Sequence, residues 1–126
     1  MAETKEQSIL VVDDNSDDRK LFRRMLENAG YSVVECSSGK EALTAVEKTR
    51  FALMTLDLSM PDMDGFEVLR AVRSKHPDVK IIVVSGFKYG SMSEAAKSMG
   101  AAETLDKNVA KFLLLPMIGD LLRDPK

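Results

Sequence analysis

The chain has little of the chemistry that covalent or zinc-based stabilisation needs. Its 126 residues include one cysteine, one histidine and no tryptophan. A single cysteine excludes a disulfide within the chain, and a single histidine leaves too few ligands for an ordinary zinc site. This composition fits a reducing compartment, and we expect the protein in the cytoplasm.

Long apolar runs and a strong charge of one sign are also missing. No run approaches the roughly 18 apolar residues of a membrane span, and the polar start lacks the order of a signal peptide. The 18 basic and 20 acidic side chains leave a net charge of -2. We therefore expect neither nucleic acid nor membrane as a partner. With 44% hydrophobic and 30% charged residues, the chain has the composition of one folded domain.

Short β-rich runs alternate with helical patterns from end to end. This alternation predicts an α/β fold, in which helices cover a parallel sheet. The expected strands are residues 9–12, 31–36, 51–56, 79–84 and 103–106. The last helix is expected within residues 109–123, where Pro116 should either delay the helix start to about Leu114 or kink the helix.

Reactive side chains follow the predicted strands at the points where the strands end. In a parallel sheet these ends share one edge, and ligands bind in the crevice beyond it. The residues concerned are Asp13, Asp14, Asp57, Ser85 and Lys107. Three carboxylates held together repel one another unless a cation joins them, and a cluster of oxygen ligands suits Mg²⁺.

A magnesium site at this edge predicts phosphoryl chemistry. The metal would bridge a phosphoryl group, Lys107 would pair with a second phosphoryl oxygen, and Ser85 would donate a hydrogen bond to a third. Asp57 lies centrally and could attack phosphorus to form an aspartyl phosphate.

Four segments in this order resemble the receiver domain of two-component response regulators. They are ILVVDD at residues 9–14, DLSMPDMDG at 57–65, VVSG at 83–86 and LDK at 105–107. The resemblance implies a flavodoxin-like, doubly wound, five-stranded parallel sheet of order 2-1-3-4-5, with helices on both faces. We expect the receiver domain at residues 8–123, short polar tails at 1–7 and 124–126, and no output domain.

The same resemblance implies how a metal would be held. Mg²⁺, with Mn²⁺ as a substitute, is expected to bind the carboxylates of Asp13, Asp14 and Asp57 and the backbone carbonyl of Ser59. This set contains oxygen ligands only.

The resemblance also implies roles in signalling. Asp57 would accept a phosphoryl group from a sensor histidine kinase or a phosphotransfer protein, Ser85 would be the phosphate-sensing hydroxyl and Lys107 the essential lysine. Phosphorylation would change contacts with a downstream protein target or a relay acceptor. We expect a switch that phosphorylates and dephosphorylates itself, not a turnover enzyme, and a monomer or weak homodimer.

Two positions depart from the family pattern. Asn108 follows Lys107 where the family usually has a proline joined by a cis peptide bond, which is far costlier for other residues. Thr104 stands where the family usually has a switching tyrosine or phenylalanine. These departures put the route of signal transmission in question, but not the phosphorylation chemistry.

Two other functions are compatible with the predicted fold. A phosphorylation-independent adaptor is favoured by Thr104 and Asn108 and opposed by the complete acidic pocket. A metal-dependent phosphatase with an aspartyl nucleophile is opposed by Ser59, because such enzymes usually have a second aspartate there. Away from the edge, Gly65 is expected to supply turn geometry and His76 to be a surface residue.

Overall fold

A computed structural model describes residues 7–58, 65–86 and 90–123 and contains ten helices and strands within them. They alternate strictly, strand then helix. In chain order they are β1 (Ser8–Val12), α1 (Ser16–Asn28), β2 (Ser32–Cys36), α2 (Gly39–Lys48), β3 (Leu53–Leu56), α3 (Gly65–Lys75), β4 (Lys80–Ser85), α4 (Gly90–Ser98), β5 (Glu103–Asp106) and α5 (Lys107–Leu122).

The strands form one parallel sheet in the order β2-β1-β3-β4-β5. The register pairs Val12 with Leu56 and Ser85 with Asp106. The carboxyl ends of the strands therefore meet at one edge. The predicted α/β fold and its strand order are confirmed.

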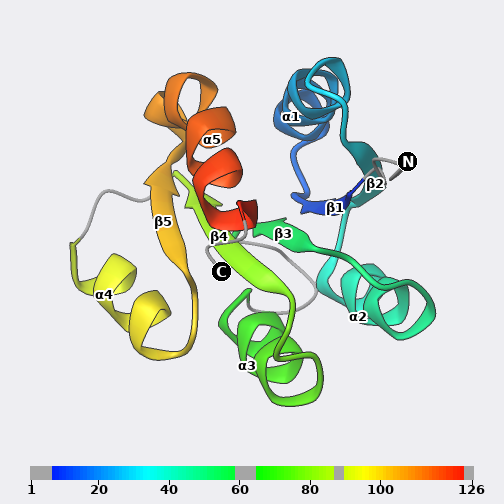
Figure 1. Cartoon of the computed structure of the whole chain (residues 1–126). Helices are drawn as coiled ribbons and strands as arrows, with labels where there is room; N and C mark the ends of the chain where they lie inside the picture. Colours follow the sequence, from blue (N-terminus) through cyan, green and yellow to red (C-terminus); the bar gives the residue numbers. More distant parts are fainter. Residues whose placement is uncertain (1–6, 59–64, 87–89, 124–126) are drawn as a thin grey trace.

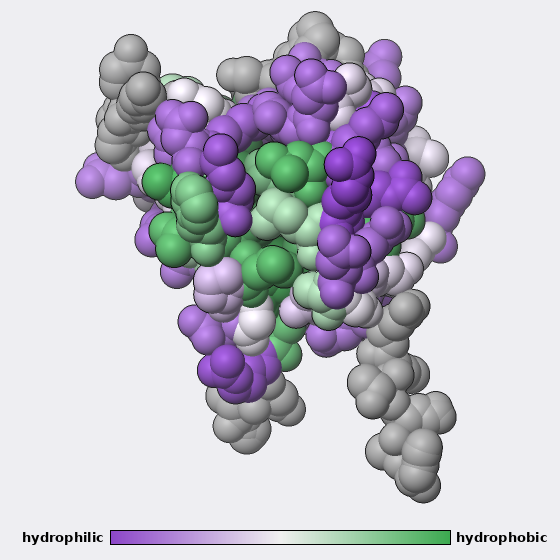
Figure 2. Space-filling view, turned by 90° about the horizontal axis from the view of Figure 1, so that it is seen from above, coloured by the Kyte–Doolittle hydropathy of each residue, from purple (hydrophilic) through white to green (hydrophobic). Residues whose placement is uncertain are grey.

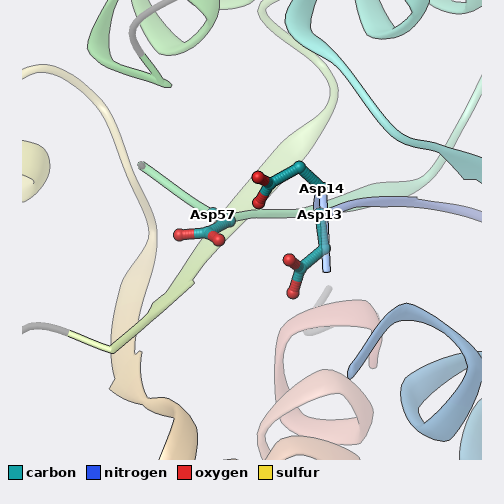
Figure 3. Close-up of side chains that lie close together, drawn as sticks. All are labelled: Asp13, Asp14 and Asp57. Carbon is teal, nitrogen blue, oxygen red and sulfur yellow. The ribbon is translucent and has the colours of Figure 1, made fainter. Parts of the chain in front are cut away.

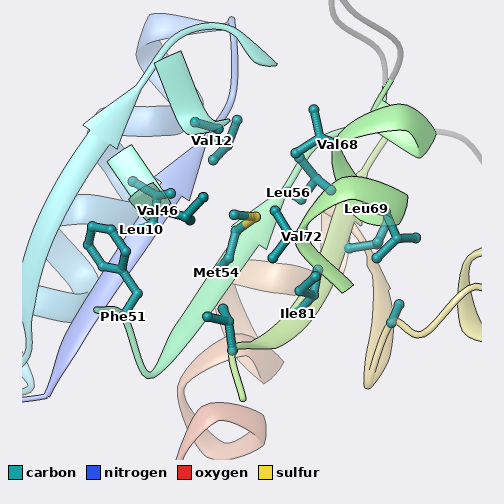
Figure 4. Close-up of a cluster of buried hydrophobic side chains, with 14 of the residues drawn as sticks. Leu10, Val12, Val46, Phe51, Met54, Leu56, Val68, Leu69, Val72 and Ile81 are labelled. Atoms are coloured by element: carbon teal, nitrogen blue, oxygen red, sulfur yellow. The ribbon is translucent and has the colours of Figure 1, made fainter. Parts of the chain in front are cut away.

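Helices cover both faces of the sheet, with α1 and α5 on one side and α2, α3 and α4 on the other (Figure 1). Successive residues of a strand point to opposite faces, so each strand supplies both apolar layers. Figure 4 shows the layer beneath α2 and α3, where Leu10, Met54 and Ile81 of the sheet face Val46 and Val72 of the helices.

Helix α5 begins earlier than the sequence pattern predicts. It runs without interruption from Lys107 and contains Pro116 in its interior. A start near Leu114 is therefore wrong. Burial explains why the helix tolerates a residue that removes one of its hydrogen bonds: Ala110, Leu114 and Ile118 are fully buried against the sheet, and such packing outweighs local propensity.

The outer side of α5 is unusually apolar. Phe112 is 72% exposed and Leu113 is 47% exposed. Figure 2 looks down on the face that carries α1 and α5, and hydrophobic residues gather in its middle between hydrophilic ones.

None of the helices in the described part of the chain has the length and apolar character needed to cross a membrane.

Gly65 is required by a close approach of two backbone segments. Its N–H donates to the carbonyl of Leu58 at 3.1 Å. A methyl group on Gly65 would collide with Cα of Leu58 and would lie 2.7 Å from the carbonyl oxygen of Asp57. Gly65 is not among the positive-φ glycines, so it serves by its small size, and it sets α3 directly against the end of β3.

We expect Gly65→Ala to lower the free energy of unfolding by about 1 to 3 kcal/mol, because backbone atoms cannot move aside as a flexible side chain can. Urea unfolding measures the change. Gly119→Ala in α5 is the matched control, since its methyl group would enter open space and should stabilise the helix by up to about 1 kcal/mol. Equal effects of the two substitutions would contradict the close approach.

Candidate functional site

The parallel ladder continues one residue beyond two of the strands and so places two aspartates side by side. The N–H of Asp57 donates to the carbonyl of Val12 at 3.0 Å, and the N–H of Asp13 donates to the carbonyl of Cys36 at 3.1 Å. Their backbones are therefore part of the sheet, and their side chains leave from its carboxyl edge.

Three carboxylates gather at this edge. Asp13 and Asp14 leave the end of β1 beside Asp57 at the end of β3 (Figure 3), and one oxygen from each lies within 4.8 Å of the others. Asp13 and Asp57 are 2% and 5% exposed, whereas Asp14 is exposed. Oxygen donors at this spacing fit Mg²⁺. Ser59, the fourth predicted ligand, lies outside the described residues.

Lys107 is the cation of the cluster. Its Nζ lies 2.9 Å from Oδ2 of Asp13, 2.8 Å from Oδ2 of Asp18 and 3.3 Å from Oδ2 of Asp57. Burial alone lowers the pKa of Lys107, but hydrogen bonds to Asp18 and Asp13 and the charge of Asp57 outweigh burial, so the pKa lies above its usual range. The ammonium stays charged and partly neutralises the carboxylates.

Ser85 is hydrogen-bonded to the second carboxylate oxygen of Asp57. Its Oγ donates to Oδ1 of Asp57 at 3.0 Å, and its side chain is 1% exposed. The two oxygens of Asp57 thus have different partners, a hydroxyl on Oδ1 and an ammonium on Oδ2. The structure brings together all the predicted strand-end residues that it describes.

Sequence reasoning missed Asp18. This residue lies in the first turn of α1, where acidic side chains are common because they complement the helix dipole. Its contact with Lys107 joins residues 89 apart in the chain, and no local pattern could have revealed that contact. Arg19, also missed, donates to the carbonyl of Asp13 at 2.8 Å and supports the turn after β1.

The two departures from the family pattern have structural consequences. No loop separates β5 from α5, because Asp106 caps the helix by accepting a hydrogen bond from the N–H of Asn108 at 2.8 Å. No cis peptide bond occurs among the described residues. The hydroxyl of Thr104 is hydrogen-bonded to that of Ser93 in α4, so a polar contact occupies the position usually held by an aromatic ring.

His76 does not join this cluster. It follows α3 at the amino end of β4, away from Ser85 at the carboxyl end. Its Nε2 lies 3.2 Å from Oε2 of Glu47. The residue is partly exposed, as the sequence analysis expects.

Burial raises the pKa of the Asp13 carboxyl. The pKa of its carboxyl is raised to about 6, first because burial disfavours the charged form. The Asn15 N–H and the Lys107 ammonium lower the pKa but do not outweigh burial. At Asp13 a proton would therefore compete with a bound cation below neutral pH.

A doubly wound parallel sheet with clustered aspartates and a lysine at its carboxyl edge defines an open α/β protein, the class in which ligands bind beyond the carboxyl ends of the strands. The family model of the response regulator receiver domain matches residues 9–118. The chain therefore belongs to the response regulator receiver domain family.

Two curated relatives illustrate the range of the family. The response regulator receiver protein CpdR of Brucella abortus is 32% identical over 99 residues, which are 79% of this chain and 82% of CpdR. The response regulator MprA of Mycobacterium leprae is 40% identical over 118 residues, which are 94% of this chain and 52% of MprA. The chain thus spans about half the length of MprA.

Solved structures confirm the fold. The chemotaxis response regulator CheY4 of Vibrio cholerae has a TM-score of 0.86 and 31% identity, with 94% of this chain and 100% of that chain covered. The response regulator TrrA of Thermotoga maritima, solved in complex with Mg²⁺ and BeF, has a TM-score of 0.84 and 31% identity, with 92% and 99% covered.

The raised pKa of Asp13 predicts how stability depends on pH. Well below pH 4 the carboxyl is neutral in both the folded and the unfolded chain. Between about pH 4 and 6 the folded state keeps the proton while the unfolded state loses it, so stability is lost as pH rises through this window. In EDTA at pH 8 we therefore expect Asp13→Asn to be more stable than the wild type, by about 1 to 2 kcal/mol.

Urea unfolding at pH 4 and pH 8 measures this difference, which should be much smaller at pH 4. Asp17→Asn is the control, because it removes an exposed charge from the neighbouring turn. A gain that persists unchanged at pH 4, or that Asp17→Asn reproduces, would contradict the assigned cause.

Proposed function

We propose that this receiver domain accepts a phosphoryl group on Asp57 from a phosphohistidine of a sensor kinase or phosphotransfer protein. The observation that carries the proposal is that the two carboxylate oxygens of Asp57 have different hydrogen-bond donors as partners. Oδ1 accepts from Ser85 at 3.0 Å and Oδ2 lies 3.3 Å from Nζ of Lys107. Both partners are donors that developing charge on a phosphoryl group requires.

The acidic cluster supports a cation in the same reaction. Asp13, Asp14 and Asp57 would hold Mg²⁺, with the backbone carbonyl of Ser59 as a further proposed ligand and Mn²⁺ as a substitute metal. The cation, when bound, would neutralise charge on the transferring phosphoryl oxygens. The fit rests on three oxygen donors within 4.8 Å of one another.

Asp57, Lys107 and Ser85 have different roles in the proposed reaction. A carboxylate oxygen of Asp57 attacks phosphorus, the bond between phosphorus and the donor imidazole nitrogen breaks, and the electron pair returns to that nitrogen. Lys107 pairs with a phosphoryl oxygen, and Ser85 donates its hydroxyl hydrogen to another. The product is an acyl phosphate at the sheet edge, and water later hydrolyses it.

The proposed output is a change in protein contacts. Phosphorylation adds about 1.5 to 2 negative charges at Asp57 and favours whichever conformation pairs them best with Lys107 and Ser85. The proposed partners are the phosphodonor and a protein target or relay acceptor. The proposed location is the cytoplasm. The protein acts as a switch, without sustained turnover of a substrate.

An adaptor that acts without phosphorylation is the second candidate. It is favoured by the apolar outer side of α5, where Phe112 is 72% exposed, and by the Ser93–Thr104 hydrogen bond in place of an aromatic switch. Partner binding that is unchanged by Asp57→Ala would identify this function.

The phosphorylation proposal is tested with acetyl phosphate and Mg²⁺, followed by intact-mass measurement. We expect one phosphoryl adduct on the wild type, none on Asp57→Asn, and none when EDTA removes the metal. Asp78→Asn, at the amino end of β4 and away from the cluster, is the matched control and should be modified like the wild type. An adduct on Asp57→Asn, or none on the wild type, would overturn the proposal.

A further inference from the structure

Lys107 has a partner that the phosphorylation chemistry does not use. Of its three carboxylate contacts, the one to Asp18 is 2.8 Å long, whereas those to Asp13 and Asp57 are 2.9 Å and 3.3 Å. Asp18 comes from α1 and is not part of the three-carboxylate cluster. It therefore draws the ammonium toward α1 without offering a ligand to the proposed cation.

Asp18 and Lys107 both lie in the first turn of a capped helix. Oδ1 of Asn15 accepts the N–H of Asp18 at 3.0 Å, and Asn15 in turn donates its own N–H to Oδ1 of Asp13 at 2.9 Å. Lys107 is the first residue of α5, whose cap is Asp106. Because each backbone is held at a helix start, the contact between Asp18 and Lys107 is set by the fold.

We propose that Asp18 is a positioning residue that holds Lys107 in the unphosphorylated state and competes with the phosphoryl group for it. This inference rests on the proposed function of Asp57. An ammonium has three N–H donors, and here three carboxylates contact it. A phosphoryl oxygen can gain a full contact with Lys107 only if one of these contacts weakens.

The contact with Asp18 is the one that phosphorylation should weaken. Its side chain is 34% exposed, against 3% and 6% for Asp13 and Asp57, so water can replace Lys107 at Asp18 at least cost. The charge of Asp18 also repels an incoming phosphoryl dianion. Both effects have the same sign, and both oppose the phosphorylated state.

The test compares Asp18→Asn with Asp17→Asn. The two residues are neighbours in the first turn of α1 and carry the same charge, but Asp18 contacts Lys107 and Asp17 is exposed. Beryllofluoride, which mimics a phosphoryl group on a carboxylate, is titrated by calorimetry at saturating Mg²⁺. Asp18→Glu keeps the charge and tests rescue.

We expect Asp18→Asn to bind beryllofluoride about two- to five-fold more tightly than the wild type, the factor that a partly exposed ion pair supplies. Asp17→Asn and Asp18→Glu should match the wild type. Mg²⁺ alone should bind Asp18→Asn equally or more weakly, because the released Lys107 pairs more closely with the ligand oxygens of Asp13 and Asp57.

Tighter beryllofluoride binding without tighter Mg²⁺ binding is a signature that a purely structural role of Asp18 would not produce. Urea unfolding verifies that each variant is folded. If the wild type binds beryllofluoride but Asp18→Asn matches Asp17→Asn or binds more weakly, the competition is refuted and the proposed function stands. If the wild type binds none, the proposed function fails and this inference fails with it.

Discussion

The cost of burying carboxylates is the constraint on which the rest of the structure depends. Asp13 and Asp57 are almost fully buried within one cluster, and buried charges that lack a partner are costly. The positive charge of Lys107 compensates these carboxylates, although Lys107 lies 94 positions along the chain from Asp13. The charge balance of the site therefore ties the first strand to the last helix.

Strand ends and helix starts lie in direct contact at the site. Oδ1 of Asp13 accepts the N–H of Asn15, and Asn15 caps α1. Gly65 brings the start of α3 against the backbone of Asp57. Lys107 opens α5 directly. Because Asp13 and Lys107 are bonded to or part of a helix start, a change of charge at these residues acts directly on α1 and α5.

These arrangements also explain which features could be predicted from the sequence. Strand ends follow from local patterns, and a parallel sheet brings its carboxyl ends together whatever the loops do; this is why Asp13, Asp57, Ser85 and Lys107 could be placed at one edge. The contact of Asp18 with Lys107 depends on how α1 and α5 lie on the sheet, which no local pattern encodes. The late start of α5 near Leu114, one of the two predicted alternatives, is wrong because Pro116 is a strong local signal, whereas the burial of Ala110, Leu114 and Ile118 is a tertiary effect.

The same geometry indicates how a signal could leave the site when the family's aromatic switch is replaced. Thr104 is short, and its hydroxyl is bonded to Ser93, so it cannot swing between an inward and an outward position as a ring does. Lys107 offers a more direct route, because it is both a partner of Asp57 and the first residue of α5. If phosphorylation pulls its ammonium away from Asp18, the force is applied to a helix whose opposite side exposes Phe112 and Leu113. The exposed apolar side chains Phe112 and Leu113 thus lie on the same helix that Lys107 begins.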